Sequence, residues 1–139
     1  MAKHVLTDAS VVVNSVDLSN HVESVEINQE FEDVDLTAMG ATAREHGKGL
    51  RNDSITINFF QDFAASSLDQ TMSPLVTNTA GFAVVIKPTS AAVSSTNPSY
   101  SMTSLLFTYS PIAASVGEAN QTSIEFLPAA GGSIVRATS

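Results

Sequence analysis

Two segments decide the fold: Val22-Glu-Ser-Val-Glu-Ile-Asn-Gln-Glu-Phe-Glu32 and, after a polar interval, Ser54-Ile-Thr-Ile-Asn-Phe-Phe-Gln61. In both segments apolar and polar residues alternate, which is the pattern of a strand with one buried face. The apolar sides carry Val25, Ile27 and Phe31 in the first segment and Ile55, Ile57 and Phe59 in the second. We therefore predict two strands whose apolar faces pack into the core.

The interval between these strands, about Leu36 to Asn52, is much longer than a hairpin turn of about two to five residues. It contains Gly40, Gly47 and Gly49, which predict a flexible loop. A long loop between two well-defined strands is commonly a functional one. We interpret this loop as an assembly arm.

Composition bounds the class of protein. The 139 residues fit a single domain, 1–139, and only 14% of them are charged. A surface poor in charge is typical of one covered by partners, because Lys and Glu are depleted in interface cores, although a Ser/Thr-rich β-protein has the same composition. The net charge of −8 argues against a protein that wraps nucleic acid.

Charge is also unevenly placed. Through Asp35 the chain carries eight acids against Lys3, whereas the following loop carries Arg44, Lys48 and Arg51 against Glu45. Such an asymmetry favours self-association, with the basic loop of one copy near the acidic strand of another.

Several classes are disfavoured by what the sequence lacks. There is no cysteine for a disulfide framework or a thiolate metal site. No apolar run reaches the roughly 18 residues of a membrane span, and the first residues lack the apolar core of a signal peptide. We expect a chain that is made and folded in the cytoplasm and does not insert into a membrane.

The rest of the chain reads mainly as strands. We expect an opening hairpin over Val5–Val13 and Val16–Leu18 with a turn at Asn14-Ser15, then one helix of about three turns that begins at Asp62 and ends near Pro74. Later strands are expected at 82–86, 100–110, 122–127 and 133–136. With about seven or eight strands in all, the pattern predicts an antiparallel β-sandwich or partly closed barrel with one flanking α-helix.

No group of residues assembles into an enzyme site. His4, His21 and His46 are read as solvent-exposed, and the acids on one face of the first strand as a solvated or lumen-facing surface rather than a calcium site. Phe59, Phe60 and Phe63 are read as core. No nucleotide-binding loop or nucleophile elbow is present, so we predict neither enzyme activity nor a cofactor.

Three stretches carry a resemblance to a known family. They are Asp33-Val-Asp-Leu-Thr-Ala-Met-Gly40, Phe59-Phe-Gln-Asp-Phe-Ala-Ala-Ser-Ser-Leu-Asp69 followed by Pro74-Leu75, and Ile86-Lys-Pro-Thr-Ser-Ala-Ala-Val-Ser-Ser-Thr-Asn-Pro-Ser-Tyr100. Their order and content resemble the major tail (tail tube) proteins of long-tailed, non-contractile bacteriophages. The resemblance spans nearly the whole chain but contains no chemical motif.

This resemblance implies a structural virion protein, located in the tail and assembled in the cytoplasm of a host bacterium. It implies six-membered rings with a continuous inner β-barrel, which stack into a tube through which DNA passes without specific binding. Implied partners are further copies of the chain and the tape-measure, terminator and tip proteins. We expect no appended surface domain of the kind that larger members have, and so no accessory role in host binding.

The resemblance also implies roles for particular residues. The loop 36–52 corresponds to an arm that reaches a neighbouring subunit or ring, and its expected contact residues are Leu36, Met39, Arg44, Lys48, Leu50 and Arg51. Tube lumens in this family tend to be acidic, and the expected lumen-facing acids are Glu26, Glu30 and Glu32.

Other functions compete with this one. A tail terminator, head–tail connector or decoration protein has a similar build, but a terminator forms a finite ring whereas a tube protein polymerises. A soluble ligand-binding β-sandwich is a further alternative, for example one that binds carbohydrate. With no Trp and only Tyr100 and Tyr109, the sequence offers few aromatic residues for such a site.

Overall fold

The computed structural model describes residues 3–139, which form ten β-strands, one α-helix and one short 3-10 helix. The strands are β1 (Ser10–Val13), β2 (Val16–Asp17), β3 (Val22–Asn28), β4 (Phe31–Asp35), β5 (His46–Arg51), β6 (Ser54–Phe60), β7 (Phe82–Lys87), β8 (Ser99–Leu106), β9 (Gln121–Pro128) and β10 (Val135–Ala137). The helices are η1 (Ser19–His21) and α1 (Leu68–Leu75).

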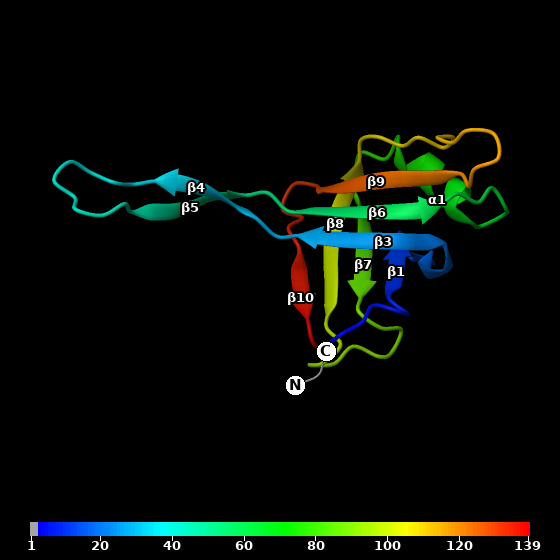
Figure 1. Cartoon of the computed structure of the whole chain (residues 1–139), viewed down its shortest axis with the longest axis horizontal. Helices are drawn as coiled ribbons and strands as arrows, with labels where there is room; N and C mark the ends of the chain where they lie inside the picture. The colour runs from blue at the N-terminus through cyan, green and yellow to red at the C-terminus, as the bar shows by residue number, and fades with distance from the viewer. Residues whose placement is uncertain (1–2) are drawn as a thin grey trace.

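Eight of these strands form one antiparallel sheet that folds over on itself. The strand order is β2-β1-β7-β8-β9-β6-β3, and β10 pairs with β8. One end of β8 pairs with β9 through 104–106, and its other end pairs with β10 through 99–101. At this junction the sheet changes direction, so that β3, β6 and β9 run along the long axis while β1, β7, β8 and β10 cross them (Figure 1).

The fold class therefore agrees with the sequence prediction. Within residues 3–139 the strands pair in antiparallel fashion, a single α-helix flanks them, and no pairing joins the ends β2 and β3 into a closed barrel. The turn of the opening hairpin also agrees, because Asn14 (φ 50°) and Ser15 (φ 67°) form a turn with two positive φ angles, the kind that matches the twist of paired strands. Its first strand is shorter than expected and begins at Ser10 rather than Val5.

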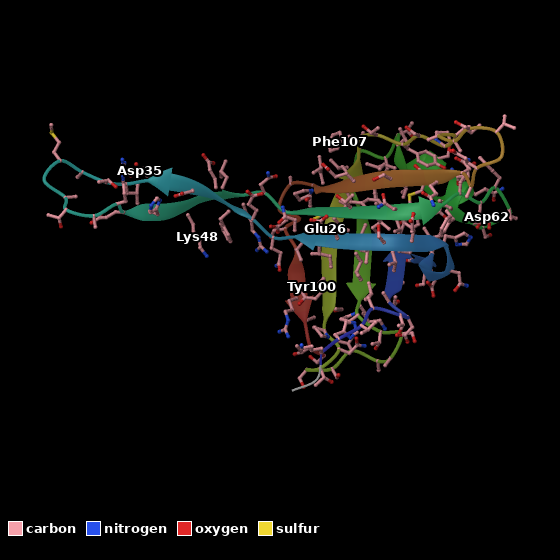
Figure 2. The ribbon with its side chains drawn as sticks, viewed as in Figure 1. Glu26, Asp35, Lys48, Asp62, Tyr100 and Phe107 are labelled. Atoms are coloured by element: carbon pink, nitrogen blue, oxygen red, sulfur yellow. The ribbon has the colours of Figure 1, made fainter. Side chains whose placement is uncertain are left out.

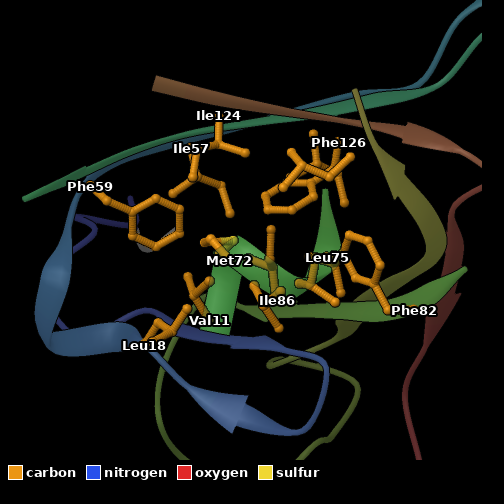
Figure 3. Close-up of a cluster of buried hydrophobic side chains, with 14 of the residues drawn as sticks. Val11, Leu18, Ile57, Phe59, Met72, Leu75, Phe82, Ile86, Ile124 and Phe126 are labelled. Carbon is orange, nitrogen blue, oxygen red and sulfur yellow. The ribbon is translucent and has the colours of Figure 1, made fainter. Parts of the chain in front are cut away.

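The core lies between the two crossing layers (Figure 3). The expected alternation is confirmed in β6, where Ile55, Ile57 and Phe59 are fully buried. The rings of Phe82 and Phe126 pack nearly perpendicular to each other, with centroids 5.8 Å apart. The buried apolar residues are Val11, Val13, Leu18, Ile55, Ile57, Phe59, Leu68, Met72, Leu75, Phe82, Val84, Ile86, Met102, Leu106, Ile124, Phe126 and Ile134.

The helix is shorter than predicted. It begins at Leu68 rather than at Asp62, because Ser66 has a φ of 58°, which a right-handed helix cannot contain. It ends at Leu75, directly after Pro74, as expected. Leu68, Met72 and Leu75 are buried, but Phe63 lies outside the helix with 54% of its surface exposed. Phe60 is exposed too, so only Phe59 of the three expected core phenylalanines is buried.

The long first strand is also corrected. It ends at Asn28, and a new strand begins at Phe31, which pairs with β5 instead of the core sheet. Phe31 is 43% exposed and does not pack in the core. Val25 and Ile27, by contrast, are partly buried and pack against the core. The prediction that Phe31 continues the buried face was wrong because the chain leaves the sheet at Gln29-Glu30.

No helix in the described part of the chain is long and apolar enough to cross a membrane.

Candidate assembly surfaces

The interval predicted to be a flexible loop is a β-hairpin. Among the strands of residues 3–139, β4 and β5 pair only with each other, and the segment 36–45 connects them. We call residues 31–51 the arm; it projects from the body along the long axis (Figure 1). None of its residues is buried. The prediction of a loop over about 36–52 is therefore corrected: the segment belongs to a hairpin, and only 36–45 lies outside its strands.

The arm exposes its large apolar side chains instead of contributing them to the core. Met39, in the connecting segment, is 104% exposed relative to the reference residue. The other exposed large apolar residues of the arm are Phe31, Val34, Leu36 and Leu50. Exposed apolar side chains gathered on one projecting element are typical of an interaction site. Leu36, Met39 and Leu50, the apolar contact residues predicted from sequence, are all available to a partner.

Two glycines leave room for neighbouring side chains on one face of the arm. A Cβ at Gly47 would lie 2.7 Å from Leu36 Cδ1, and a Cβ at Gly49 would lie 2.8 Å from Val34 Cγ2. Both distances are shorter than van der Waals contact, so the side chains of Val34 and Leu36 occupy the space above the glycine backbones. The glycines thus permit close packing across the hairpin, and the flexibility predicted from them is not their role here.

Asp33 and Asp35 each have a side-chain partner within the arm. Arg44 Nη1 donates to Asp35 Oδ2 at 2.9 Å, and His46 Nδ1 lies 2.8 Å from Asp33 Oδ1. Hydrogen bonds from Thr37, and to a lesser extent from Arg44, lower the pKa of Asp35. These acids were expected to meet cations of a neighbouring copy, but each already has a partner in its own arm. Exposed pairs of this kind contribute about 0–1 kcal/mol each.

The root of the arm is fixed to the body by a buried carboxylate. Arg51 Nε lies 2.7 Å from Asp53 Oδ2, and the Asp53 side chain is fully buried. The backbone N–H of Ile134 donates to the same oxygen at 2.8 Å, and that of Glu30 donates to Oδ1 at 3.2 Å. Within its own chain, Arg51 joins the arm to the segment before β10.

Phe31 forms a second contact at the root. Two cations lie over its ring, with Lys48 Nζ 4.7 Å and Arg51 Cζ 5.4 Å from the centroid. Cations over an aromatic face contribute about 0.5–1 kcal/mol at exposed sites. Lys48 is therefore held beside Phe31 in the isolated chain.

The layer formed by β3, β6 and β9 presents a polar outer face. Cross-strand register places Glu26, Thr56 and Glu125 in one row, and Ser24, Asn58 and Ser123 in the next. The two glutamates are two strand spacings apart, or about 10 Å. Glu125 was missed from sequence because nothing local shows that β9 lies beside β6.

The other two predicted lumen acids lie elsewhere. Glu30 is at the root of the arm, where its backbone bonds Asp53, and Glu32 is in β4 beside Gly49. The expectation that Glu26, Glu30 and Glu32 share one strand face fails, because β3 ends before Glu30. Of these three, only Glu26 belongs to the polar face of β3, β6 and β9.

His21, Asp62 and Ser67 meet before α1, in a combination that resembles a catalytic triad. His21 Nε2 lies 2.8 Å from Asp62 Oδ2 and 3.0 Å from Ser67 Oγ. A triad uses different imidazole nitrogens for the acid and the nucleophile, but here both partners share Nε2. His21 Nδ1 is buried and finds no partner among the described residues. His21 is thus half-buried and has a structural role. The prediction that it is exposed to solvent was wrong.

This cluster stabilises the turn that precedes the helix. The amide of Ala64, then Ser67 and His21, donate hydrogen bonds to the Asp62 carboxylate, which lowers its pKa to about 2. His4 and His46 are exposed, as expected. Residues 3–139 contain no group of three or more His, Asp or Glu side chains arranged to hold a metal ion.

No protein-family model and no curated protein matches this sequence. Solved structures do match in fold. A chain from the virion of a native gene transfer agent particle aligns with a TM-score of 0.71 and 14% identity, covering 92% of this chain and 95% of that one. The chain has a tail tube-like fold.

Two further structures have the same fold. A chain from the tail of an empty gene transfer agent particle with C6 symmetry has a TM-score of 0.67 at 15% identity, covering 86% of this chain and 83% of that one. A chain from the sheath/tube terminator of an extracellular contractile injection system has a TM-score of 0.72 at 10% identity, covering 98% of this chain and 97% of that one. The fold thus occurs in a contractile system as well, and does not by itself indicate a non-contractile tail.

Proposed function

We propose that this chain is a structural, non-enzymatic virion protein of a long-tailed, non-contractile phage. Copies assemble into six-membered rings, and the rings stack into a tail tube through which DNA passes. The observation that carries the proposal is the arm: a paired hairpin that leaves the body, exposes Leu36, Met39 and Leu50, and buries none of its residues. A second copy of the chain is the partner that we assign to it.

The tail tube-like fold supports this proposal, since one of the matched chains comes from a tail with C6 symmetry. By analogy we place six copies in a ring, with tape-measure, terminator and tip proteins as further partners in the tail. Assembly then takes place in the cytoplasm of the host bacterium.

We assign the polar outer face of β3, β6 and β9 to the lumen of the tube. Its rows contain hydroxyl and amide side chains together with Glu26 and Glu125, and no Lys or Arg occurs in these strands. A wall with this composition repels phosphate and offers no cation that would bind it, so DNA passes without sticking. The assignment extends to neither Glu30 nor Glu32.

A tail terminator is the second candidate, because a chain from a sheath/tube terminator has the same fold over nearly its whole length. The two functions differ in the product of assembly. Tube subunits add rings without limit, whereas a terminator stops as a finite ring.

A soluble ligand-binding protein is less well supported. An open groove of about 660 Å³ lies between residues 6–10 and the first part of β3. Its lining includes Asp8, Ser10, Asp17 and Glu23 but no aromatic residue on which a sugar ring would stack.

Negative-stain microscopy of the purified protein at high concentration tests the proposal. We expect hollow tubes of variable length with six-fold end views. Finite rings that never lengthen would favour the terminator, and a monodisperse monomer at every concentration would exclude both functions.

A further inference from the structure

Opposite the arm, the chain carries an ordered loop without regular secondary structure. Residues 107–120 connect β8 with β9 beside α1. Gln61 Nε2 donates to Tyr109 Oη at 2.8 Å and to the Pro111 carbonyl at 2.9 Å, and Asn120 Nδ2 donates to the same carbonyl at 3.1 Å. The loop is therefore fixed to the end of β6 instead of moving freely.

Tyr109 also ties this loop to the helix. Its hydroxyl donates to Asp69 Oδ1 at 2.8 Å. Burial, with the adjacent Asp69, raises the pKa of Tyr109 to about 12, so the hydroxyl keeps its proton. A loop fixed in this way loses little further conformational freedom when a partner binds it.

The anchored loop and the neighbouring turn expose apolar side chains. Ile112 is 75% exposed and Val116 is 106% exposed, while Phe60 and Phe63 flank the anchoring residue Gln61 and its neighbour Asp62. We call Phe60, Phe63, Ile112 and Val116 the distal surface. Because these side chains are held on an ordered frame and still face solvent, they are typical of a binding surface.

The distal surface and the arm lie at opposite ends of the long axis. Figure 2 labels Asp35 on the arm at one end and Asp62 beside the turn at the other. An arm therefore cannot fold back onto the distal surface of its own chain. A second copy, displaced along the axis, brings its arm to this end.

The two regions also match in composition. The tip of the arm, residues 36–43, and the loop from 107 to 117 contain no charged residue. Charges flank both: Arg44 follows the tip, and Glu118 follows the loop. Contact between them thus buries apolar surface without desolvating an ion, and it leaves the charged residues at the rim, as in ordinary interfaces.

We propose that the distal surface receives the tip of the arm of a second copy, with Leu36 and Met39 packing against Ile112, Val116 and Phe63. This inference rests on the proposed function and names the receiving site for the arm. The contact joins two different surfaces head to tail, which leaves a free arm at one end and a free distal surface at the other. A repeated contact of this type generates an open polymer rather than a closed dimer.

Disulfide trapping tests the assignment, because the chain has no native cysteine. One population carries Met39→Cys, a second carries Val116→Cys, and a tag on one population separates mixed dimers by mass. Val135→Cys, on an exposed position of β10 away from α1, is the matched control. A disulfide requires Cα atoms within about 7 Å of each other. We expect a mixed dimer from Met39→Cys with Val116→Cys under assembly conditions, and none with the control.

The outcomes separate this inference from the proposed function. Tubes that form while Met39→Cys fails to trap Val116→Cys, or traps the control instead, would overturn the assignment and leave the tube function standing. A Val116→Cys thiol equally reactive toward maleimide in tubes and in monomers would also overturn it, because it would show that nothing covers the distal surface in the tube. Failure of the unmodified chain to polymerise would contradict both.

Discussion

Arg51 and Asp53 form the connection between the arm and the body: Arg51 Nε lies 2.7 Å from Asp53 Oδ2 at the root of the hairpin. Arg51 Nη2 also donates to the Ile134 carbonyl at 3.0 Å, so the pair fixes the arm relative to the segment before β10. A fixed orientation of the arm favours binding to a partner, because a hairpin that is free to swing loses more conformational entropy on docking than one already held in place.

Replacing Asp53 with Ala should therefore lower stability and loosen the arm. The change removes the acceptor of the partly exposed Arg51 and of the N–H groups of Glu30 and Ile134. Leaving a buried N–H such as that of Ile134 without an acceptor typically costs about 1–3 kcal/mol. Urea denaturation measures the loss. Asp53→Asn, which keeps an acceptor oxygen, should lose less; equal stability of wild type and Asp53→Ala would contradict the role given to this residue.

Enlarging Gly49 should affect assembly more than folding. Even the Cβ of alanine would approach Val34 Cγ2 to 2.8 Å, and valine adds two further methyl groups. Gly49→Val should distort the arm, with Gly49→Ala intermediate. Because the arm contributes nothing to the core, we expect the urea midpoint of the monomer to change little. The concentration needed for polymerisation should rise, about tenfold for each 1.4 kcal/mol by which the association free energy weakens. Unchanged assembly of Gly49→Val would show that the shape of the arm is unimportant.

Acid should weaken the turn before α1. The pKa of Asp62 in the folded chain is about 2, below the ordinary value of 3.8. Its contribution to stability is thus fully present above pH 3.8 and disappears as the pH falls through about 2. Urea midpoints measured from pH 5 to pH 2 should fall less steeply for Asp62→Asn than for wild type. Parallel curves for the two proteins would mean that the hydrogen bonds of Asp62 do not stabilise the fold.

The charge of the proposed lumen should govern the passage of DNA. Glu26→Lys combined with Glu125→Lys should permit tube assembly, since both side chains point away from the core, but it should slow DNA ejection by adding cations to the channel. The matched control, Glu26→Gln with Glu125→Gln, removes charge without adding cations and should slow ejection less. If the lysine variant ejects DNA at the wild-type rate, these residues do not line the channel.

The strands of the core were predictable because burial leaves a local pattern. In β6, alternation correctly identified Ile55, Ile57 and Phe59 as buried. In β9, within the strand expected at 122–127, the apolar residues Ile124 and Phe126 face inward and their neighbours face out. The arm has no such pattern. β5 reads His-Gly-Lys-Gly-Leu-Arg, with no buried face, and only its pairing with β4 makes it a strand.

The missed parts of the site depend on contacts between distant segments. Asp53 and Ile134 meet across the fold, and the row of Glu26, Thr56 and Glu125 requires the register of three strands. The start of α1 was misplaced because Asp62 has the residue type of a helix cap but uses its carboxylate for Ala64, Ser67 and His21 in a non-helical turn.

The most direct test of the central claim, that the arm drives assembly, is electron microscopy of a chain in which Thr37–Lys48 is replaced by a short Gly-Ser turn. We expect a folded monomer, with the circular dichroism and urea midpoint of the wild-type monomer, because no core residue is removed. We also expect no tubes at concentrations at which the wild type polymerises. Tubes of normal length and stability from the shortened chain would contradict the claim.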